Sequence, residues 1–420
     1  MSENLQELMQ SIGLKARNAY CLLAEASDES KKLALRQAAA AMRAGLGDIL
    51  AANQKDMQAG KVAGLSKAVL DRLELSEKRI ENVAKSLEDI AELPDPVGKI
   101  LAKFERPNGL MIERVSVPLG VVGIIYESRP NVTADAGALC IKSGNAAILR
   151  AGSDSLHSSL AIAECLRSGL KAAGLPQDAV QLVPTNDRDA VGQMLKMTGV
   201  IDVIVPRGGK SLTSLVMQDS RVPTLLHLDG NCHTYIHSAA DPEMALSILI
   251  NAKMRRTGIC GATETLLIDK QMLAMLPKLV EALIAEGCEV RGDELARSTD
   301  SRIKVASEED WFTEYLDAII AIKTVGNVEE AISHINIYGS HHTDAIITKD
   351  QAAADLFLKQ VDSAIVMHNA STQFADGGEF GFGGEIGIAT GRLHARGPVG
   401  VEQLTTYKYV VKGSGQIRPK

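Results

Sequence analysis

Strand and helix patterns alternate from residue 119 onward, and this alternation constrains the fold of the 420-residue chain more than any other feature. The run Leu119–Tyr126 is apolar almost without a break, as in a parallel strand that is buried on both faces. Strand patterns recur at 146–150, 180–183 and 201–205, and helical patterns cover 131–143, 156–173 and 190–197. We therefore predict an α/β fold with a doubly wound parallel sheet, whose ligands bind beyond the carboxyl ends of the strands.

The remaining segments predict further parts of the molecule. A chain of this length exceeds what one hydrophobic core usually holds, so two or three domains are expected. Residues 2–90 have helical patterns, 101–117 suggests a hairpin that turns at 107–109, and 404–411 alternates like a strand that another subunit could complete. After residue 230, helical patterns alternate with a second set of strands and predict a second doubly wound α/β domain, with strands at 263–268, 289–290, 317–323, 344–348 and 364–367.

Charge and cysteine usage argue against several classes of protein. The formal net charge is −7 with no long basic run, which argues against nucleic acid or an anionic membrane as a partner. No apolar run approaches the length that spans a bilayer, and the first ten residues are polar, so we expect neither a membrane helix nor a signal peptide. The six cysteines show no CxxC pair, which indicates free thiols in a reducing cytoplasm without a disulfide framework or a structural metal.

Cys260 is the candidate nucleophile. It lies in the connection between a helix that opens at Asp241-Pro242 and the strand pattern 263–268. Two arginines at 255 and 256 precede it, and glycines at 258 and 261 flank it. Nearby cations lower the pKa of a thiol, and glycines let a ligand approach the backbone. A buried structural cysteine is the alternative that residue type alone favours, and these neighbours make the two interpretations about equal.

Two predicted strand ends carry polar and basic residues. The segment 127–131, Glu-Ser-Arg-Pro-Asn, follows the first strand of the doubly wound sheet, and 206–210, Pro-Arg-Gly-Gly-Lys, follows the fourth strand and precedes a helix. Glycines at a helix N-terminus leave backbone N–H groups free to bind phosphate. The alternative is an ordinary solvated turn. Neither GxGxxG nor a Walker loop is present, so no standard dinucleotide fingerprint supports the phosphate interpretation.

Several motifs that occur in one order along the chain resemble the gamma-glutamyl phosphate reductase family, a branch of the aldehyde dehydrogenase superfamily. They are Tyr-Glu-Ser-Arg-Pro-Asn at 126–131, Lys-Ser-Gly-Asn-Ala-Ala-Ile-Leu-Arg at 142–150, Val-Pro-Arg-Gly-Gly at 205–209, Met-Arg-Arg-Thr-Gly-Ile-Cys at 254–260, the Gly- and Phe-rich segment 374–388, and His-Ala-Arg-Gly-Pro at 394–398. Two positions depart from the family pattern, since Gly261 stands where Asn is frequent and Thr257 where Pro is common. Neither departure removes the thiol.

The resemblance implies a fold and a reaction. The fold would combine a cofactor-binding domain (1–103, 119–229 and 364–393), a catalytic domain (230–363) and a small β oligomerisation element (104–118 and 394–420). The reaction would be the NADPH-dependent reduction of L-glutamyl 5-phosphate to L-glutamate 5-semialdehyde and phosphate, the second step of proline biosynthesis. Cys260 would form a thioester, and its backbone N–H with Asn131, or with a group near Ser128, would stabilise the oxyanion.

The resemblance also assigns binding residues. Arg150 would contact the adenosine ribose and a 2′-phosphate of the NADPH, with Lys142 nearby, and Glu314 would hold the nicotinamide ribose. The adenine and pyrophosphate would be flanked by Pro206, Arg207, Gly208, Gly209 and Lys210. The substrate phosphate and carboxylate would be bound by residues that include three arginines, of which at least one is expected to be a surface cation; these residues are Ser128, Arg129, Arg255 and Arg256.

Alternatives and partners stay open at this point. Hydrolytic relatives carry a glutamate base that would fall near 227–229, where His227 stands, and its absence agrees with a reductive enzyme that does not activate water. His227 is otherwise a strand residue of the core. A CoA-acylating or hydrolytic aldehyde dehydrogenase and a catalytically silent binding protein are the other two hypotheses. We expect a homo-oligomer that acts on a small molecule, and a transient contact with glutamate 5-kinase is left open.

Overall fold

The computed structural model describes residues 3–418 and divides the chain into two compact units. Unit 1 comprises Met1–Leu226, Gly381–Gly387 and Pro398–Lys420, and unit 2 comprises His227–Phe380 and Ile388–Gly397. Each unit contains its own parallel sheet, so the predicted fold class of two α/β parts is confirmed.

Five helices form the beginning of unit 1, as the sequence pattern predicts. Serines start three of them: Ser27, Ser66 and Ser76 each accept a hydrogen bond from the backbone N–H three residues later. The last of the five buries one apolar face that recurs at helical spacing. The bounds are α1 (Glu3–Leu23), α2 (Asp28–Ala44), α3 (Leu46–Val62), α4 (Lys67–Leu73) and α5 (Glu77–Glu92).

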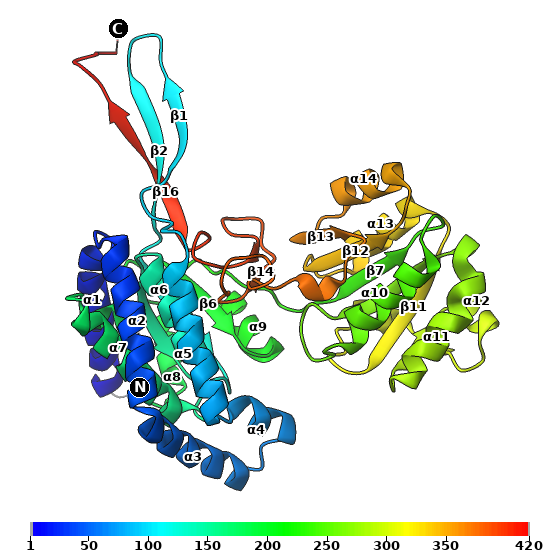
Figure 1. Ribbon diagram of the computed structural model, residues 1–420, viewed down its shortest axis with the longest axis horizontal. Helices are drawn as coiled ribbons and strands as arrows, with labels where there is room; N and C mark the ends of the chain where they lie inside the picture. The colour runs from blue at the N-terminus through cyan, green and yellow to red at the C-terminus, as the bar shows by residue number, and fades with distance from the viewer. Residues whose placement is uncertain (1–2, 419–420) are drawn as a thin grey trace. The chain divides into compact units, whose positions relative to one another are not determined.

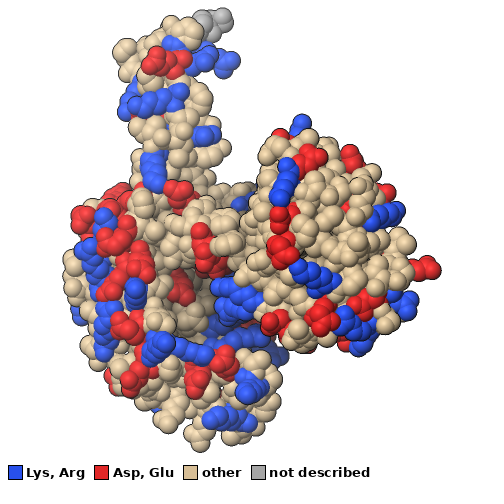
Figure 2. All heavy atoms as spheres, turned by 45° about the vertical axis from the view of Figure 1, so that its right-hand side comes forward, with Lys and Arg blue, Asp and Glu red and all other residues tan. Residues whose placement is uncertain are grey.

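Acidic and basic side chains are mixed over the helical surface of unit 1 (Figure 2). Arg43 and Arg36 of α2 pair with Glu81 and Glu92 of α5 at 2.8 Å and 2.5 Å. Exposed pairs of this kind contribute little stability each, but they leave no continuous field of one sign over these helices. No helix within 3–418 is both long enough and apolar enough to cross a membrane.

The core of unit 1 is a four-stranded parallel sheet in the order β5-β4-β3-β6. All six residues of the central strand β3 are buried, which explains its unbroken apolar run. Tyr126 and Arg207 are register partners at the ends of β3 and β6, so the segments that follow these strands start at the same edge. The strands are β3 (Val121–Tyr126), β4 (Ala146–Arg150), β5 (Val180–Leu182) and β6 (Val203–Arg207), and the helices are α6 (Asn131–Lys142), α7 (Leu156–Ala172), η1 (Gln177–Ala179), α8 (Asp189–Met194) and α9 (Lys210–Asp219).

A three-stranded antiparallel ribbon extends away from the helices of unit 1 (Figure 1). It consists of β1 (Ile100–Glu105), β2 (Met111–Pro118) and β16 (Thr405–Lys412), in the order β1-β2-β16, and we call it the β-arm. The hairpin predicted at 107–109 is confirmed, with Gly109 at a φ of 84° that favours glycine. β16 pairs with β2 of its own chain over its full length, so the tail strand finds its partner without another subunit.

Unit 2 is built on a seven-stranded parallel sheet in the order β10-β9-β11-β8-β7-β12-β13. The central strands β7, β8 and β12 are buried throughout. The strands are β7 (Cys232–Ile236), β8 (Thr263–Asp269), β9 (Glu289–Gly292), β10 (Lys304–Val305), β11 (Ile319–Val325), β12 (Thr343–Ile347) and β13 (Ile365–His368). The helices are α10 (Pro242–Met254), η2 (Lys270–Met275), α11 (Leu276–Ala285), α12 (Glu294–Thr299), η3 (Glu308–Phe312), α13 (Val328–Tyr338), α14 (Gln351–Gln360) and η4 (Thr372–Phe374), and the short strands β14 (Ile388–Ala389) and β15 (Gly397–Pro398) follow.

One expectation differs from the structure of unit 2. The segment 364–393 was expected to belong with the first α/β part, but 364–380 and 388–393 lie in unit 2, because β13 pairs with β12 at the edge of the seven-stranded sheet. The 3₁₀ helix η2 leads directly into the α-helix α11 at Leu276. Pro277 fits the first turn of α11, since it lacks the N–H that an interior helical position requires.

Candidate active site

The Cys260 loop joins α10 to β8 within unit 2. Asp241 caps α10 by accepting hydrogen bonds from the N–H groups of Glu243 and Met244 at 3.1 Å each, as the sequence predicts. The helix ends at Met254 and β8 begins at Thr263, which leaves 255–262 as the loop. Cys260 is partly exposed on it, whereas four of the other five cysteines are buried. The interpretation of Cys260 as a buried structural cysteine is therefore wrong.

A glycine outside this loop lets it take its position. A Cβ atom added at Gly230 would lie 2.1 Å from the carbonyl oxygen of Cys260, a distance that no real contact reaches. Gly261 is also close-packed, with its Cβ position 3.1 Å from the carbonyl oxygen of Thr372. Glu314 holds Gly230 in place, because its carboxylate accepts a 2.9 Å hydrogen bond from the Gly230 N–H. The absence of a side chain at these two glycines lets neighbouring backbone segments pack closely, in addition to any approach by a ligand.

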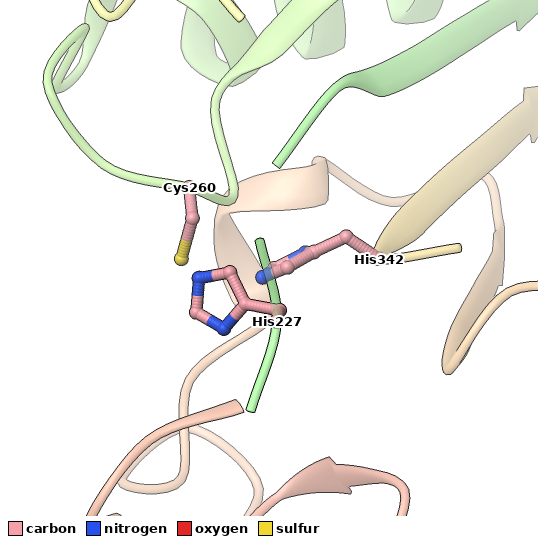
Figure 3. Close-up of side chains that lie close together, drawn as sticks. All are labelled: His227, Cys260 and His342. Carbon is pink, nitrogen blue, oxygen red and sulfur yellow. The ribbon is translucent and has the colours of Figure 1, made fainter. Parts of the chain in front are cut away.

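Two imidazole rings face the thiol. The Sγ of Cys260 and one ring nitrogen each of His227 and His342 all lie within 4.8 Å of one another. Figure 3 shows the Sγ directed toward the ring of His227, and the ring of His342 directed toward the same point. The two rings contact each other edge to face, with 5.1 Å between their centroids. All three residues belong to unit 2, so the cluster lies within one compact unit.

Hydrogen bonds fix how the two rings present their nitrogens. The Nδ1 of His227 lies 2.6 Å from the carbonyl oxygen of Ile388, which can only accept, so Nδ1 carries the proton and Nε2 has the free lone pair. The Nδ1 of His342 lies 2.9 Å from the Thr343 hydroxyl and 3.6 Å from the Sγ of Cys232. Both rings are therefore held from the Nδ1 side.

Cys232 is a buried thiol that holds the backbone of the nucleophile loop. Its Sγ donates to the carbonyl oxygen of Cys260 at 3.0 Å. Burial raises the pKa of the Cys232 thiol well above its ordinary value, and the neighbouring Asp344 adds to this effect. The thiol consequently keeps the proton that it donates.

A buried ion pair connects the two ends of the loop. Lys253, near the end of α10, pairs with Glu264 at the start of β8, and both side chains are completely buried. Glu264 also accepts a 3.2 Å hydrogen bond from the Leu316 N–H. Burial raises the pKa of Glu264 to about 7, although Lys253 opposes the shift. The pair fixes the distance between the two elements that carry Cys260.

The arginines that precede Cys260 are both exposed. Arg255 donates to the side chain of Gln373 at 3.2 Å. The same Gln373 donates to the carbonyl oxygens of Ala252 and Arg256, so it ties the loop to η4. The side chain of Arg256 lies at the surface, as expected for at least one of the arginines.

In unit 1, the predicted segments after β3 and β6 do meet at the sheet edge. The carboxylate of Glu127 accepts a 3.0 Å hydrogen bond from the Gly209 N–H at the start of α9. A Cβ at Gly208 would lie 2.5 Å from the same carboxylate, so a larger residue at this position would displace the Glu127 side chain. Pro206 is buried at the end of β6, Arg207 is half-buried and Lys210 is exposed. The N-terminus of α9 thus already has a negatively charged neighbour.

The two oxyanion candidates of unit 1 have local partners. Asn131 donates to Asp135 in the next turn of α6 at 3.0 Å, and burial raises the pKa of Asp135. Ser128 adopts a φ of 45° and donates to Asp154. Arg129 lies between them and is half-buried.

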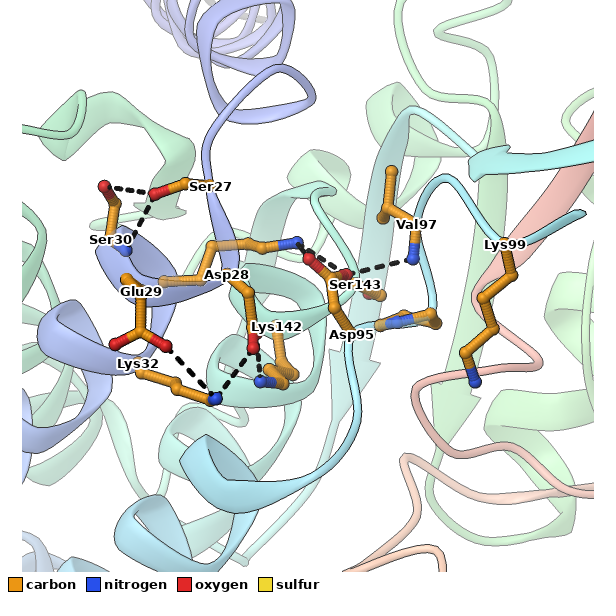
Figure 4. A network of polar contacts seen from close by, with 12 residues as sticks. Ser27, Asp28, Glu29, Ser30, Lys32, Asp95, Val97, Lys99, Lys142 and Ser143 are labelled. Atoms are coloured by element: carbon orange, nitrogen blue, oxygen red, sulfur yellow. Dashed lines mark hydrogen bonds and ion pairs between the residues drawn. The ribbon is translucent and has the colours of Figure 1, made fainter.

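Arg150 and Lys142 are both far less accessible than expected. Arg150 is 6% exposed and donates to the backbone carbonyls of Asn186 and Asp187 at 3.3 Å each, so it supports the loop after β5. Lys142 is completely buried, and Figure 4 shows its ammonium beside the carboxylate of Asp28. Its ammonium pairs with Asp28 at 2.5 Å and donates to the carbonyl oxygen of Ala91 at 2.9 Å. The assignment of Lys142 to a cofactor site is corrected, because this ammonium joins α6 to α2 and α5.

The structure therefore brings some of the predicted residues together and gives others a different neighbourhood. Cys260 and Glu314 are linked through Gly230, which was not predicted as a site residue, and 127–131 meets 207–210 at one sheet edge. No sequence motif indicated His342 as a site residue, and His227 was expected either at the position of an absent base or as a core strand residue. Both histidines stand outside any local motif, so only the fold places them beside the thiol.

Comparisons with known proteins agree with this architecture. The model of the aldehyde dehydrogenase family matches residues 6–301. The gamma-glutamyl phosphate reductase of Rhodospirillum rubrum is 62% identical over 419 residues, which cover 100% of this chain and 98% of that protein. The enzyme of the same name from Parvibaculum lavamentivorans is 61% identical, with 99% of both chains covered.

A solved structure gives the same result in three dimensions. The crystal structure of the gamma-glutamyl phosphate reductase from Thermotoga maritima superposes with a TM-score of 0.96 at 43% identity, and the match covers 98% of this chain and 100% of that one. Since sequence and structure both match from end to end, the chain belongs to the gamma-glutamyl phosphate reductase family, a branch of the aldehyde dehydrogenases.

Proposed function

We propose that this chain reduces L-glutamyl 5-phosphate to L-glutamate 5-semialdehyde and phosphate with NADPH, through a thioester on Cys260, as the second step of proline biosynthesis. The observation that carries the proposal is the partly exposed thiol of Cys260 with two imidazole rings beside it. Membership of the aldehyde dehydrogenase family supports oxidoreduction with a nicotinamide cofactor. The names of the relatives support the substrate.

In this proposal His227 accepts the proton of the nucleophile. Its Nε2 has the lone pair, because Nδ1 donates to the carbonyl oxygen of Ile388. The thiolate of Cys260 attacks the acyl carbon, the bond to phosphate breaks, and an enzyme-bound thioester remains.

The oxyanion formed on the acyl carbon needs donors that are already in place. We assign the first to the backbone N–H of Cys260, because Cys232 and Gly230 hold the peptide groups of that loop. Asn131 stays our candidate for the second donor. Its amide has two hydrogens, of which one is directed to Asp135.

For the cofactor, the carboxyl edge of the sheet in unit 1 has suitable residues. The start of α9 at Gly208 and Gly209 would take a phosphate group once the Glu127 carboxylate leaves the Gly209 N–H, and Arg207 and Lys210 supply positive charge. Glu314 remains the candidate for the nicotinamide ribose, and Arg129, Arg255, Arg256 and Ser128 remain candidates for the substrate. When bound, the cofactor supplies the hydride that reduces the thioester to the aldehyde. The preference for NADPH over NADH rests on Arg207 and Lys210, because the Arg150 guanidinium donates to the backbone carbonyls of Asn186 and Asp187.

The same proposal includes an oligomer and a cytoplasmic location. Both β1 and β16 are edge strands of the β-arm, and they expose apolar side chains that a second copy could cover, namely Phe104, Tyr407, Tyr409 and Val411. The six cysteines are free thiols, which persist in a reducing compartment. A transient contact with glutamate 5-kinase stays a prediction.

The reverse reaction tests the proposal, because the forward substrate is labile. The protein is mixed with pyrroline-5-carboxylate, the cyclised semialdehyde, with NADP⁺, and with or without phosphate, and the absorbance of reduced cofactor is followed. Reduction that depends on phosphate is expected. Reduction without phosphate would indicate a hydrolytic dehydrogenase, and a requirement for CoA would indicate an acylating one. The Cys260→Ser variant is the matched control and should be inactive in every mixture.

A further inference from the structure

The cluster around Cys260 combines three side chains that metal ions bind well. One thiol and two imidazoles supply one sulfur and two nitrogen atoms, all within 4.8 Å of one another. In a tetrahedral zinc site, bonds of about 2.3 Å to sulfur and about 2.0 Å to nitrogen place such ligand atoms roughly 3.3–3.6 Å apart. Metal binding therefore requires these atoms to approach one another, and the Cys260 side chain, which is partly exposed on a loop, contributes to this approach by rotating.

The surroundings of the two rings provide an independent observation. A histidine that binds a metal through Nε2 typically has its Nδ1 held by a hydrogen-bond partner. His227 has this partner in the carbonyl oxygen of Ile388 at 2.6 Å. His342 has two on its Nδ1 side, Thr343 at 2.9 Å and Cys232 at 3.6 Å. Both rings are therefore fixed in an orientation that suits a metal at the thiol (Figure 3).

We propose that Cys260, His227 and His342 form a binding site for Zn²⁺ that blocks the nucleophile reversibly. The thiol loses its proton to solvent when its sulfur binds the metal, and the two imidazoles bind through their Nε2 lone pairs. No electron transfer occurs, and the fourth ligand position is taken by water. One thiolate with two imidazoles suits Zn²⁺ far better than Mg²⁺ or Ca²⁺, which prefer oxygen ligands.

Metal binding has a direct consequence for the enzyme. A thiolate that is bonded to Zn²⁺ cannot attack an acyl phosphate, and the same bond protects the sulfur from alkylation and oxidation. The inhibitory effect rests on the proposed role of Cys260 as nucleophile, whereas binding itself does not. The two can therefore be measured separately.

The test measures binding in the full-length protein without substrate. The purified apoprotein competes for Zn²⁺ with a chromophoric chelator of known affinity, and protons released on binding are counted in weakly buffered solution. We expect one Zn²⁺ per chain with release of one proton. Cys260→Ser, His227→Gln and His342→Gln should each lower the affinity roughly 10-fold or more, and Thr343→Ala should lower it within the roughly 10–100-fold range typical of a ligand's supporting residue. Co²⁺ should give a thiolate charge-transfer band that Cys260→Ser removes.

Two matched variants separate this site from ordinary surface binding. His341→Gln removes the exposed histidine next to His342, whose Nδ1 contacts the carbonyl oxygen of Asp362 at 2.5 Å, and Cys21→Ser removes an exposed thiol. Both should bind Zn²⁺ as the unchanged protein does. Circular dichroism checks folding, since His342 is buried, and Cys260→Ser supplies the decisive comparison if His342→Gln does not fold.

Three outcomes would overturn the proposal. They are undiminished affinity in Cys260→Ser, an equal loss in His341→Gln, and absence of stoichiometric binding in a protein that reduces NADP⁺ normally. The last result would leave the proposed function standing. Stoichiometric binding in a protein without phosphate-dependent turnover would support the site and refute the proposed reaction, so the two failures are distinguishable.

Discussion

The loop of Cys260 in unit 2 and the sheet edge of Glu127 in unit 1 both carry residues that the sequence predicts to be functional, but these residues are held differently in the two regions. Around Cys260, the buried thiol of Cys232 and the half-buried carboxylate of Glu314 fix the backbone and leave the reactive thiol partly exposed. At the sheet edge, charged groups are held by one another or by backbone, as Glu127 is by Gly209 and Arg150 by carbonyl oxygens. The comparison separates a preformed nucleophile site from a surface whose polar groups must exchange partners to take a ligand.

Replacement of the nucleophile should have the largest effect and tests directly whether the Cys260 loop is the reactive site. Cys260→Ala should lower kcat by roughly 10⁴-fold or more, because no other group can form the thioester. Its partly exposed position means that the free energy of unfolding should change by less than about 1 kcal/mol. Steady-state rates and thermal unfolding check both values. Turnover that survives in this variant would refute the thioester mechanism.

His227→Gln should have the next largest effect. It removes the lone pair that faces the thiol but keeps a polar side chain of similar size, so kcat should fall roughly 10²-fold or more. His341→Gln is the control and should retain full activity, since this ring lies on Asp362. Equal rates in the two variants would exclude His227 from the chemistry.

Gly230→Ala tests the backbone that positions the nucleophile. The added Cβ would collide with the Cys260 carbonyl group, so the loop must move, with an expected cost of about 1–3 kcal/mol in stability and a decrease in kcat. Gly258→Ala is a matched change in the same loop, because its Cβ would meet only the Leu316 carbonyl oxygen at 3.9 Å. Similar losses in both variants would mean that glycine flexibility, not close approach, matters here.

Lys142→Met tests whether Lys142 is a buried ion-pair partner in unit 1 and not a cofactor-binding residue. It removes one partner of a buried ion pair and should lower the free energy of unfolding by about 1–3 kcal/mol, since Asp28 keeps Lys32 as a second partner at 2.8 Å. The KM for NADPH should stay unchanged, whereas Arg207→Ala should raise it. A higher cofactor KM in the Lys142 variant would restore the original assignment.

The smallest expected effect is on pH dependence. Burial raises the pKa of Glu264 from 4.5 to about 7, so between these values the folded state binds more protons than the unfolded state. Stability from this group is therefore present at low pH and declines as the pH rises through that range. Glu264→Gln should flatten this decline in denaturant titrations at pH 4.5 and 7. If the free energy of unfolding changed with pH equally in both proteins, Lys253 would be shown to keep the Glu264 carboxylate charged throughout this range.

The parts that the sequence predicted correctly are those with a local cause. The cap at Asp241, the apolar run of β3 and the turn at Gly109 each depend on a few neighbouring residues. Lys142 was misassigned because the sequence of a motif does not show whether the ammonium of its lysine contacts a ligand or a buried carboxylate. His342 and the place of β13 were not predictable, because they depend on which strands become neighbours in the sheet.

The β-arm has a consequence for how the protein is made. Thr405 of β16 pairs with Pro118 of β2, so the ribbon started by the hairpin cannot be finished until both α/β units have left the ribosome. Until then, the backbone N–H and C=O groups along one edge of β2 are unpaired and can form hydrogen bonds with other nascent chains. We expect a pause in translation before β16 to increase aggregation. The pairing of β16 with β2 should be the last step in the folding of unit 1.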